Sequence, residues 1–362
     1  MQAMKPRCLF RSSIVALAIH FAALAGPVPV IYSTDLLHPH DDPDDHYDLA
    51  TLFALSEFEI KGIVLDLGER QAQRCGKPAL EQMFAITGRK VPWATGLAKP
   101  LKTKHDDARD QPTESQGGVE LILSTLRHAR EPVLIFTTGS CRDVAAAFNR
   151  EPDLLRQKVR ALYINIGRGP NEEQDEWNVK LDQSSYLRLF ESGLPLFWCP
   201  CFGTNGYQTL FVVDQSKVLG ACVRPVQNYF VYCLTKAKSD PIDFLRTGPH
   251  PVPTGPRNMW CTAPMLHASG RRIYERSPSE YVALPVEKAR EAQLSDKELN
   301  LFEFEPIRAE LRGKPNDPFV QHKPSNPNAR VFRTVNPRYG EIMANCLEHL
   351  LANLGRPEAE PR

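Results

Sequence analysis

The sequence predicts an α/β protein with an open, mostly parallel β-sheet and helices on both faces. Short apolar runs alternate with amphipathic segments between residues 28 and 201, which is typical of strands joined by helices. Several apolar runs end at a glycine or an aspartate, as strands do where they enter a turn. Apolar residues make up 42% and charged residues 24% of the 362 residues, so a packed core is expected and a disordered chain is excluded.

The predicted strands and helices follow one another in a regular order. Apolar runs predict strands at 28–32, 60–67, 133–138, 159–166 and 196–201. Leu49, Leu52 and Phe53 have helical spacing in the first amphipathic segment. Such spacing predicts helices at 44–58, 78–87, 119–130, 143–149 and 184–192. Gly193 follows the last of these, as glycine commonly does at a helix C-terminus.

The pattern weakens after residue 240. Helices are predicted at 259–269 and 337–354, but residues 275–335 hold many prolines and charges and show no clear period. This composition suggests long irregular connections. We predict one domain over 26–362 with an elaborated proline-rich part at about 240–335.

The first residues have the pattern of a secretory signal peptide. Residues 1–13 contain basic and no acidic residues, 14–24 are apolar apart from one histidine, and Ala23 and Ala25 suit a cleavage site. We expect residues 1–25 to be a signal peptide and the protein to be exported, periplasmic or extracellular. A buried first strand or an uncleaved anchor is the alternative. No later segment is apolar for long enough to cross a membrane, so no membrane association is expected after signal removal.

Charge and cysteine content narrow the class of protein. Lysine and arginine total 44 and aspartate and glutamate 43, a net charge of +1, which argues against a nucleic-acid partner. Eight of the nine cysteines lie after the signal segment. Export permits disulfides, but most of these cysteines lie in apolar runs, so free buried thiols are equally expected. Cys199 and Cys201 do not have a zinc-site spacing.

Aspartates are concentrated after the first predicted strand, at the sheet edge where parallel α/β proteins bind ligands. Six lie within fourteen positions: Asp35, Asp41, Asp42, Asp44, Asp45 and Asp48. Carboxylates this dense repel one another unless a cation or protons intervene, and oxygen ligands without cysteine or histidine favour Ca²⁺. Helix capping is the alternative, with Asp42 as the N-cap and two acids in the first turn. Capping leaves Asp35 unexplained.

Five motifs occur in order along the chain. The first runs from Asp35 to Pro43-Asp44-Asp45, and the others are 134–139 ending in Thr-Gly, 163–167 ending in glycine, 176–179 reading Glu-Trp-Asn-Val, and Asp182 with 190–195. Together they resemble the inosine-uridine nucleoside hydrolase family, which has Asp-x-Asp-Pro-Gly-x-Asp-Asp first and Glu-Phe-Asn later. The resemblance covers roughly residues 28–200 and fades beyond them.

The resemblance implies a nucleoside hydrolase-like fold and calcium-dependent hydrolysis of the N-glycosidic bond of ribonucleosides to base and ribose. The partner would be a small-molecule nucleoside or a related glycoside, and a homo-oligomer would be typical. Asp35 would be a Ca²⁺ ligand and the base that activates water, with Asp45 and the Thr138 carbonyl as further ligands. The sugar would be held by Asp44, Glu176 and Asn178, with Asn171 near its 5′ side.

Carboxylates around the sugar suit this reaction, because bond cleavage builds positive charge on the ribosyl ring. If 176–178 is extended, Glu176 and Asn178 share one face and point into one pocket. Trp177 would offer an aromatic face near the sugar or base, or would instead pack in the core.

Three departures from the family pattern affect the predicted site. About five residues are inserted between Asp35 and Asp44, so that Asp42 becomes a candidate ligand or base as well. Ser33 stands where the family has its leading aspartate. The family's late calcium ligand, an aspartate at the start of a helix, is missing from 258–264. His267 lies further along, and we expect it on a helix face rather than in the site.

These departures keep two alternatives open. A lost carboxylate weakens calcium binding, so the chain could be a non-catalytic riboside- or sugar-binding protein on the same scaffold. The insertion could also reshape the pocket for another glycosidic substrate. His38, His40 and His46 near the insertion could protonate a leaving base, bind a transition metal, or belong to a solvated turn.

Overall fold

A nine-stranded sheet forms the centre of the computed structural model, which describes residues 26–40, 43–311, 318–322 and 326–356. The strand order is β13-β12-β14-β6-β5-β4-β1-β2-β3. The bounds are β1 (Val28–Thr34), β2 (Phe58–Leu65), β3 (Trp93–Thr95), β4 (Val133–Thr137), β5 (Val159–Asn165), β6 (Leu196–Cys199), β12 (Phe302–Leu311), β13 (Pro318–His322) and β14 (Ala329–Thr334). The strands from β14 to β3 pair in parallel, and β12 pairs antiparallel with both β13 and β14. The predicted signal peptide, Asp41 and Asp42 lie outside the described residues.

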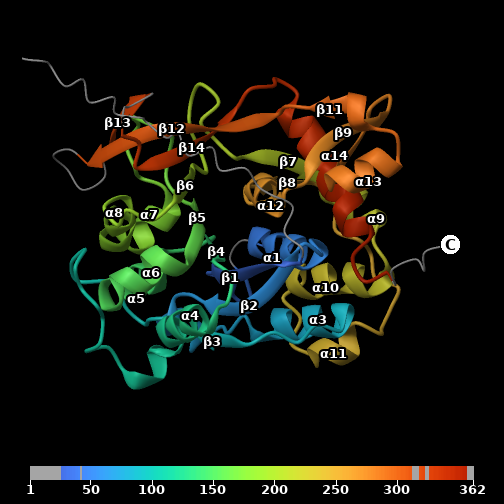
Figure 1. Ribbon diagram of the computed structural model, residues 1–362. Coiled ribbons are helices and arrows are strands. Elements are labelled where there is room, and N and C mark those ends of the chain that lie inside the picture. The colour runs from blue at the N-terminus through green and yellow to red at the C-terminus, as the bar shows by residue number, and fades with distance from the viewer. Residues whose placement is uncertain (1–25, 41–42, 312–317, 323–325, 357–362) are drawn as a thin grey trace, which may run out of the picture.

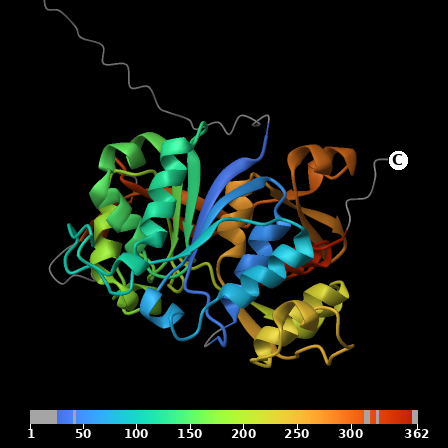
Figure 2. The same cartoon turned by 90° about the horizontal axis from the view of Figure 1, so that it is seen from below.

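Helices cover both faces of the sheet (Figures 1 and 2). The helices are α1 (Asp44–Ala54), α2 (Gly68–Gln71), α3 (Lys77–Thr87), α4 (Gly117–His128), α5 (Arg142–Arg150), α6 (Pro152–Lys158), α7 (Trp177–Leu181), α8 (Gln183–Phe190), α9 (Gln215–Gly220), α10 (Arg224–Leu234), α11 (Pro241–Phe244), α12 (Thr262–Ser269), α13 (Val286–Glu291) and α14 (Tyr339–Ala352). In Figure 1, α4, α5, α6 and α8 lie on one side of the central strands, and α1, α3, α10, α12 and α14 lie on the other.

The two layers of helices explain why the central strands are apolar throughout. Side chains alternate between the faces of a strand, so Leu134 and Phe136 of β4 join one buried cluster. Val133 and Ile135 of the same strand join the other cluster. A strand buried on both faces reads as a continuous apolar run, which is the pattern that predicted this sheet. The predicted fold class is confirmed.

Two predicted boundaries differ from the observed ones. The first helix ends at Ala54 rather than at residue 58, because Leu55 takes an extended backbone (φ −91°, ψ 96°) and β2 begins at Phe58. The helix predicted from residue 259 begins at Thr262 as α12. Met259, where the predicted helix begins, is instead the last residue of β8 (Pro256–Met259), which pairs with β7 (Phe211–Asp214).

The prediction of irregular connections in the proline-rich part was wrong. Much of this part is strand: β9 (Arg272–Ser277), β10 (Glu280–Leu284) and β11 (Glu298–Leu299) form a small sheet. β12, β13 and β14 extend the main sheet beyond β6. Their charged residues hide the period because antiparallel strands at the edge of a sheet carry polar side chains among the buried ones.

The order of the strands reverses at the centre of the sheet. From β1 the sheet continues through β2 to β3 on one side, whereas β4, β5 and β6 follow one another outward on the other side. The loops after β1 and β4 therefore part at the carboxyl ends of two adjacent strands, and such a crevice is where open α/β sheets bind ligands. Among the described residues, no helix is both long and apolar enough to cross a membrane.

Candidate active site

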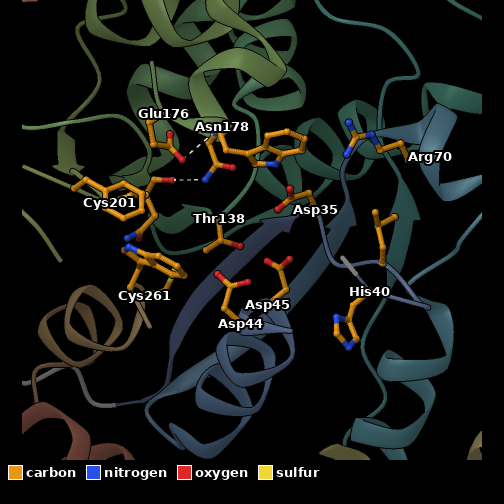
Figure 3. Close-up of a pocket in the computed structure, with 15 residues that line it drawn as sticks. Asp35, His40, Asp44, Asp45, Arg70, Thr138, Glu176, Asn178, Cys201 and Cys261 are labelled. Carbon is orange, nitrogen blue, oxygen red and sulfur yellow. Dashed lines mark hydrogen bonds between the residues drawn. The ribbon is translucent and has the colours of Figure 1, made fainter. Parts of the chain in front are cut away.

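A cavity of about 390 Å³ lies at the carboxyl ends of β1, β4 and β5. It collects side chains from several elements, and Figure 3 shows acidic side chains converging on it from opposite sides. Its lining residues are Asp35, Leu37, His40, Asp44, Asp45, Arg70, Thr138, Asn165, Glu176, Trp177, Asn178, Cys201, Phe202, Trp260 and Cys261. Most of the residues predicted for the site are therefore brought together here.

Asp35 and Thr138 lie side by side because their strands are paired in register. Ser33 of β1 is opposite Thr137 of β4, so the residues that follow both strands emerge at the same edge. The Asp35 carboxylate then rests against the backbone of Gly139. A Cβ atom at residue 139 would lie 2.8 Å from Asp35 Oδ1, closer than real Cβ contacts allow. Glycine at this position is thus required by the placement of Asp35.

Asp44 and Asp45 reach the cavity from the first turn of α1, which begins directly after Pro43. Their side chains point from the helix toward Asp35 and Thr138 (Figure 3). Thr34 Oγ1 donates a hydrogen bond of 3.1 Å to Asp45 Oδ1, which ties the helix to the end of β1. The predicted first-turn position of both acids is confirmed. The prediction of Asp42 as the N-cap was wrong, because the N-cap of α1 is Pro43, which has no side-chain capping hydrogen bond. Asp42 itself lies outside the described residues.

The buried carboxylates oppose one another's ionisation. Burial and the nearby charges of Asp66 and Glu176 raise the pKa of Asp35 to about 7. Burial and the charges of Asp35 and Asp44 raise the pKa of Asp45 well above its usual range. A cation between Asp35 and Asp45 would remove this penalty, and their oxygen ligands suit Ca²⁺. Within the described ranges no group of three acidic, histidine or cysteine side chains is close enough to bind a metal by itself. A bound cation would need further oxygen ligands, for which Thr138 is placed.

Glu176 and Asn178 line the opposite wall, but the backbone between them is not extended as predicted. Glu176 is the N-cap of α7, and its carboxylate accepts hydrogen bonds from the backbone N–H groups of Gly167 (2.8 Å), Asn178 (3.0 Å) and Val179 (3.4 Å). Asn178 Nδ2 donates to the carbonyl of Asn165 at 2.9 Å. Free N–H groups at a helix start attract a carboxylate, and this cap holds both side chains at the cavity.

Trp177 borders the cavity and does not pack in the core. Its side chain is 54% exposed, and a hydrogen bond from it to Asp35 lowers the pKa of that carboxyl, against the effect of burial. The alternative of core packing is therefore wrong. Asn171 is exposed, has a left-handed backbone (φ 63°) and is not among the residues that line the cavity. Its suggested place near the sugar has no support from this geometry.

Asn165 and Arg70 also line the cavity, and the sequence analysis missed both. The amide of Asn165 is buried at the end of β5, and neither of its side-chain polar atoms has a hydrogen-bond partner among the described residues. An unpaired buried amide is costly unless a ligand completes it. A polar residue that ends an otherwise apolar strand was the available signal for Asn165. Arg70 had no comparable signal.

The three histidines near the insertion do not form a solvated turn, so that alternative was wrong. His38, His40 and His46 are only 9%, 7% and 1% exposed. They are buried because the chain folds back against α10: the His38 ring stacks on Tyr232 at 4.7 Å, and the His46 ring lies 5.8 Å from that of Tyr229. Of the three, His40 lines the cavity.

Trp260 and Cys261 line the cavity directly before α12, at the start of the helix where the family has its late calcium-binding aspartate. Burial and the charge of the Asp48 carboxylate, which also forms a hydrogen bond with the thiol, raise the pKa of Cys261 well above its usual value. His267 lies away from the cavity and bonds Tyr163 Oη through Nδ1 at 2.8 Å. All eight cysteines among the described residues are free thiols, so the free-thiol alternative holds.

A substitution at Gly139 tests the contact that places Asp35. We expect Gly139→Ala to displace the Asp35 carboxylate and lower any activity of the site by about tenfold or more, because small displacements of a catalytic group are costly. Turnover and the melting temperature are the measurements. Gly220→Ala is the matched control, since a Cβ there meets nothing within 4 Å. Equal activity in both variants would contradict this view of Gly139.

The fold and the site together define an α/β protein with an acidic cavity at the switch point of its sheet. The profile of the inosine-uridine preferring nucleoside hydrolases matches residues 30–246, and the chain belongs to this family. Curated relatives include the pyrimidine-specific ribonucleoside hydrolases RihA of Escherichia coli O6:H1, 26% identical over 187 residues, and of Salmonella agona, 27% identical over 187 residues. Each match covers 47% of this chain, and the chain spans 58% of the length of these relatives.

Solved structures support the same fold over most of the chain. A purine-preferring ribonucleoside hydrolase from Gardnerella vaginalis superposes with a TM-score of 0.56 at 15% identity, covering 90% of this chain and 99% of that one. A plant nucleoside hydrolase gives 0.54 at 15% identity with the same coverage. The type III effector protein XopQ, solved with adenosine diphosphate ribose, gives 0.50 at 16% identity and covers 91% and 94%. Identities this low establish the fold alone.

Proposed function

We propose that this protein hydrolyses the N-glycosidic bond of ribonucleosides, releasing base and ribose, and that the reaction depends on calcium. The observation that carries the proposal is the pairing of Asp35 and Asp45 in one buried cavity with Glu176 and Asn178. This arrangement supports the proposal because a bound sugar would have carboxylates around it, which a reaction with positive charge on the ribosyl ring requires. The family and the hydrolase names of its relatives support the same class of reaction.

Several of the cavity residues have a named part in this proposal. Asp35 takes the proton from the attacking water. Asp44 accepts hydrogen bonds from the ribose hydroxyls, and the Asn178 amide donates to them. Asp35, Asp45 and Thr138 would hold the calcium ion, with Asp42 as a further candidate. When bound, the ion would lower the pKa of the water and fix its position. Of the three histidines near the insertion, His40 lines the cavity and is the candidate proton donor to the departing base.

A second candidate is a riboside- or sugar-binding protein without activity. It is favoured by the wall at Trp260 and Cys261, which supplies no carboxylate where the family has its late calcium ligand. The two candidates share the ligand and differ in the fate of the glycosidic bond.

A base-release assay tests the proposal. The purified protein is incubated with a panel of ribonucleosides and of other glycosides, with calcium and with a chelator, and free base and free sugar are measured. We expect release from ribonucleosides that stops on chelation and is absent in Asp45→Asn. Saturable binding without release would favour the binding protein. Release from other glycosides alone would place the substrate outside the nucleosides.

The pKa shifts predict that calcium stabilises the protein more at high pH. Asp35 has a pKa of 3.8 when unfolded and about 7 when folded, so the native state binds more protons between these values. Without cations, the contribution of Asp35 to the free energy of unfolding should fall as pH rises from 4 to 7 and stay low above 7. Calcium at 100 times its Kd should add about 2–3 kcal/mol at pH 8 and less at pH 5, where protons compete. Melting curves at both values measure this. An equal shift at pH 5 and pH 8 would contradict it.

We also propose that the protein is exported after removal of residues 1–25. The support is the order of basic, apolar and small residues at the N-terminus. Mass spectrometry of the protein recovered from outside the cytoplasm tests the proposal, and we expect a mass that lacks residues 1–25. Protein that stays inside the cytoplasm with an intact N-terminus would overturn it.

A further inference from the structure

Arg70 is the one lysine or arginine among the described residues that line the cavity. The same cavity holds Asp35, Asp44, Asp45 and Glu176. Sugar hydroxyls and a cation account for these carboxylates in the proposed function. Neither the sugar hydroxyls nor the cation explains why the permanent positive charge of Arg70 lies at the cavity.

The Arg70 guanidinium does not neutralise the carboxylates. Within the described parts of the chain it forms no ion pair and no side-chain hydrogen bond, and its contact is the ring of Trp177, 5.2 Å from Cζ to the centroid. Figure 3 shows the group turned toward the side of the cavity where Asp35 lies. An arginine stacked on an aromatic ring keeps its N–H edge available, and this edge matches the oxygens of a phosphate or carboxylate.

The backbone that carries Arg70 is fixed in place. Leu67 is left-handed (φ 63°), and the Arg70 N–H donates to the Leu67 carbonyl at 2.7 Å. A Cβ atom at Gly68 would lie 2.3 Å from the Gly96 carbonyl oxygen, so the two segments are in close contact. The Gln71 side chain donates to the carbonyl oxygens of Leu36 (2.9 Å) and Asp66 (3.0 Å). The position of Arg70 is thus built into the fold, and a group held in advance binds its ligand at lower entropic cost.

We propose that Arg70 binds an anionic group on the riboside, so that the preferred ligand is a charged riboside such as a nucleotide. That the ligand is a riboside rests on the proposed function. The anionic group is either a phosphate on the sugar or a carboxylate on the base, and both offer paired oxygens to a guanidinium. Trp177 orients the guanidinium from one side, while the carboxylates hold the sugar and the cation.

Binding of uncleaved fragments tests this inference apart from catalysis. Titration calorimetry on the full-length protein compares ribose with ribose 5-phosphate, and uracil with orotate. We expect at least one charged fragment to bind about tenfold or more tightly than its neutral counterpart. Arg70→Gln should remove this preference, a loss of about 10- to 100-fold for the charged fragment, and leave the neutral fragment within about twofold. The pair that shows the effect identifies the sugar or the base as the carrier of the charge.

Two variants separate recognition from general charge or folding effects. Lys99→Gln removes a positive charge from an exposed side chain that pairs with Glu69 outside the cavity, and it should change no affinity. Arg70→Lys keeps the charge without the planar fork and should lie between wild type and Arg70→Gln. Equal affinities for charged and neutral fragments, or a preference that survives in Arg70→Gln, would overturn the inference. An Arg70-dependent preference in a protein that releases no base would support it while the proposed hydrolysis fails.

Discussion

Asp35→Asn should lower base release by about 10²- to 10⁴-fold and at the same time stabilise the cation-free protein. The first effect follows from the loss of a general base. The second follows because burial and neighbouring carboxylates raise the pKa of Asp35 to about 7, so the native state carries an ionised group at pH 8 only at a cost. An amide of the same shape removes that cost and can still accept the hydrogen bond from Trp177.

Opposite signs for activity and stability distinguish a catalytic carboxylate from a structural one. Turnover and denaturant unfolding at pH 8 without calcium are the two measurements. Asp153→Asn is the control, because its side chain is 86% exposed and its surface pair with Arg156 contributes little. A destabilised Asp35→Asn protein, or one with wild-type turnover, would show that Asp35 has a structural part instead.

Arg142→Met should destabilise the fold by about 3–5 kcal/mol. Arg142 is buried, with Nε 3.6 Å from Asp66 Oδ1 and 3.8 Å from Asp182 Oδ2. Its Nη2 donates to the Leu181 carbonyl at 2.8 Å, and its Nε donates to Ser140 Oγ at 3.0 Å. Removing the guanidinium leaves two buried carboxylates without a positive charge beside them, and an uncompensated buried charge strongly destabilises the folded state.

Chemical denaturation measures this effect, and Arg127→Met is the matched control. Arg127 pairs with Glu151 at the surface, where such a pair contributes little to stability. Arg142 joins the loops after β2 and β4 to the junction of α7 and α8, all of which flank the cavity. We therefore expect the variant to lose ligand affinity before it unfolds. A loss similar to that of Arg127→Met would mean that the buried pair adds no stability.

The fold was predictable because its signals are local. A strand buried on both faces is apolar along its length, and a helix packed on one side is apolar at helical spacing, so the order from 28 to 201 could be read directly. The strands from Arg272 to Thr334 were missed because most of them lie at a sheet edge or in a small sheet, where charges interrupt the pattern. Such strands form because they pair with segments far away in the sequence, and a local pattern does not reveal this pairing.

The candidate site was predictable only in part for the same reason. The aspartates after β1 and the Glu-Trp-Asn segment stand out as motifs, and the cavity brings Asp35, Asp45 and Glu176 together. Arg70 and Asn165 reach the same cavity from separate elements, and their importance depends on side-chain polar groups without a hydrogen-bond partner among the described residues. Such an absence exists only in three dimensions, so no sequence pattern could reveal it.

Calcium titration of the chelator-treated protein tests the central claim most directly. Calorimetry on wild type and on Asp45→Asn asks whether the carboxylates at the end of β1 and the start of α1 hold a cation despite the neutral wall at Cys261. We predict one calcium site in wild type and its loss in Asp45→Asn, which keeps the hydrogen bond from Thr34 and should stay folded. No binding in wild type, or equal binding in both proteins, would contradict the account.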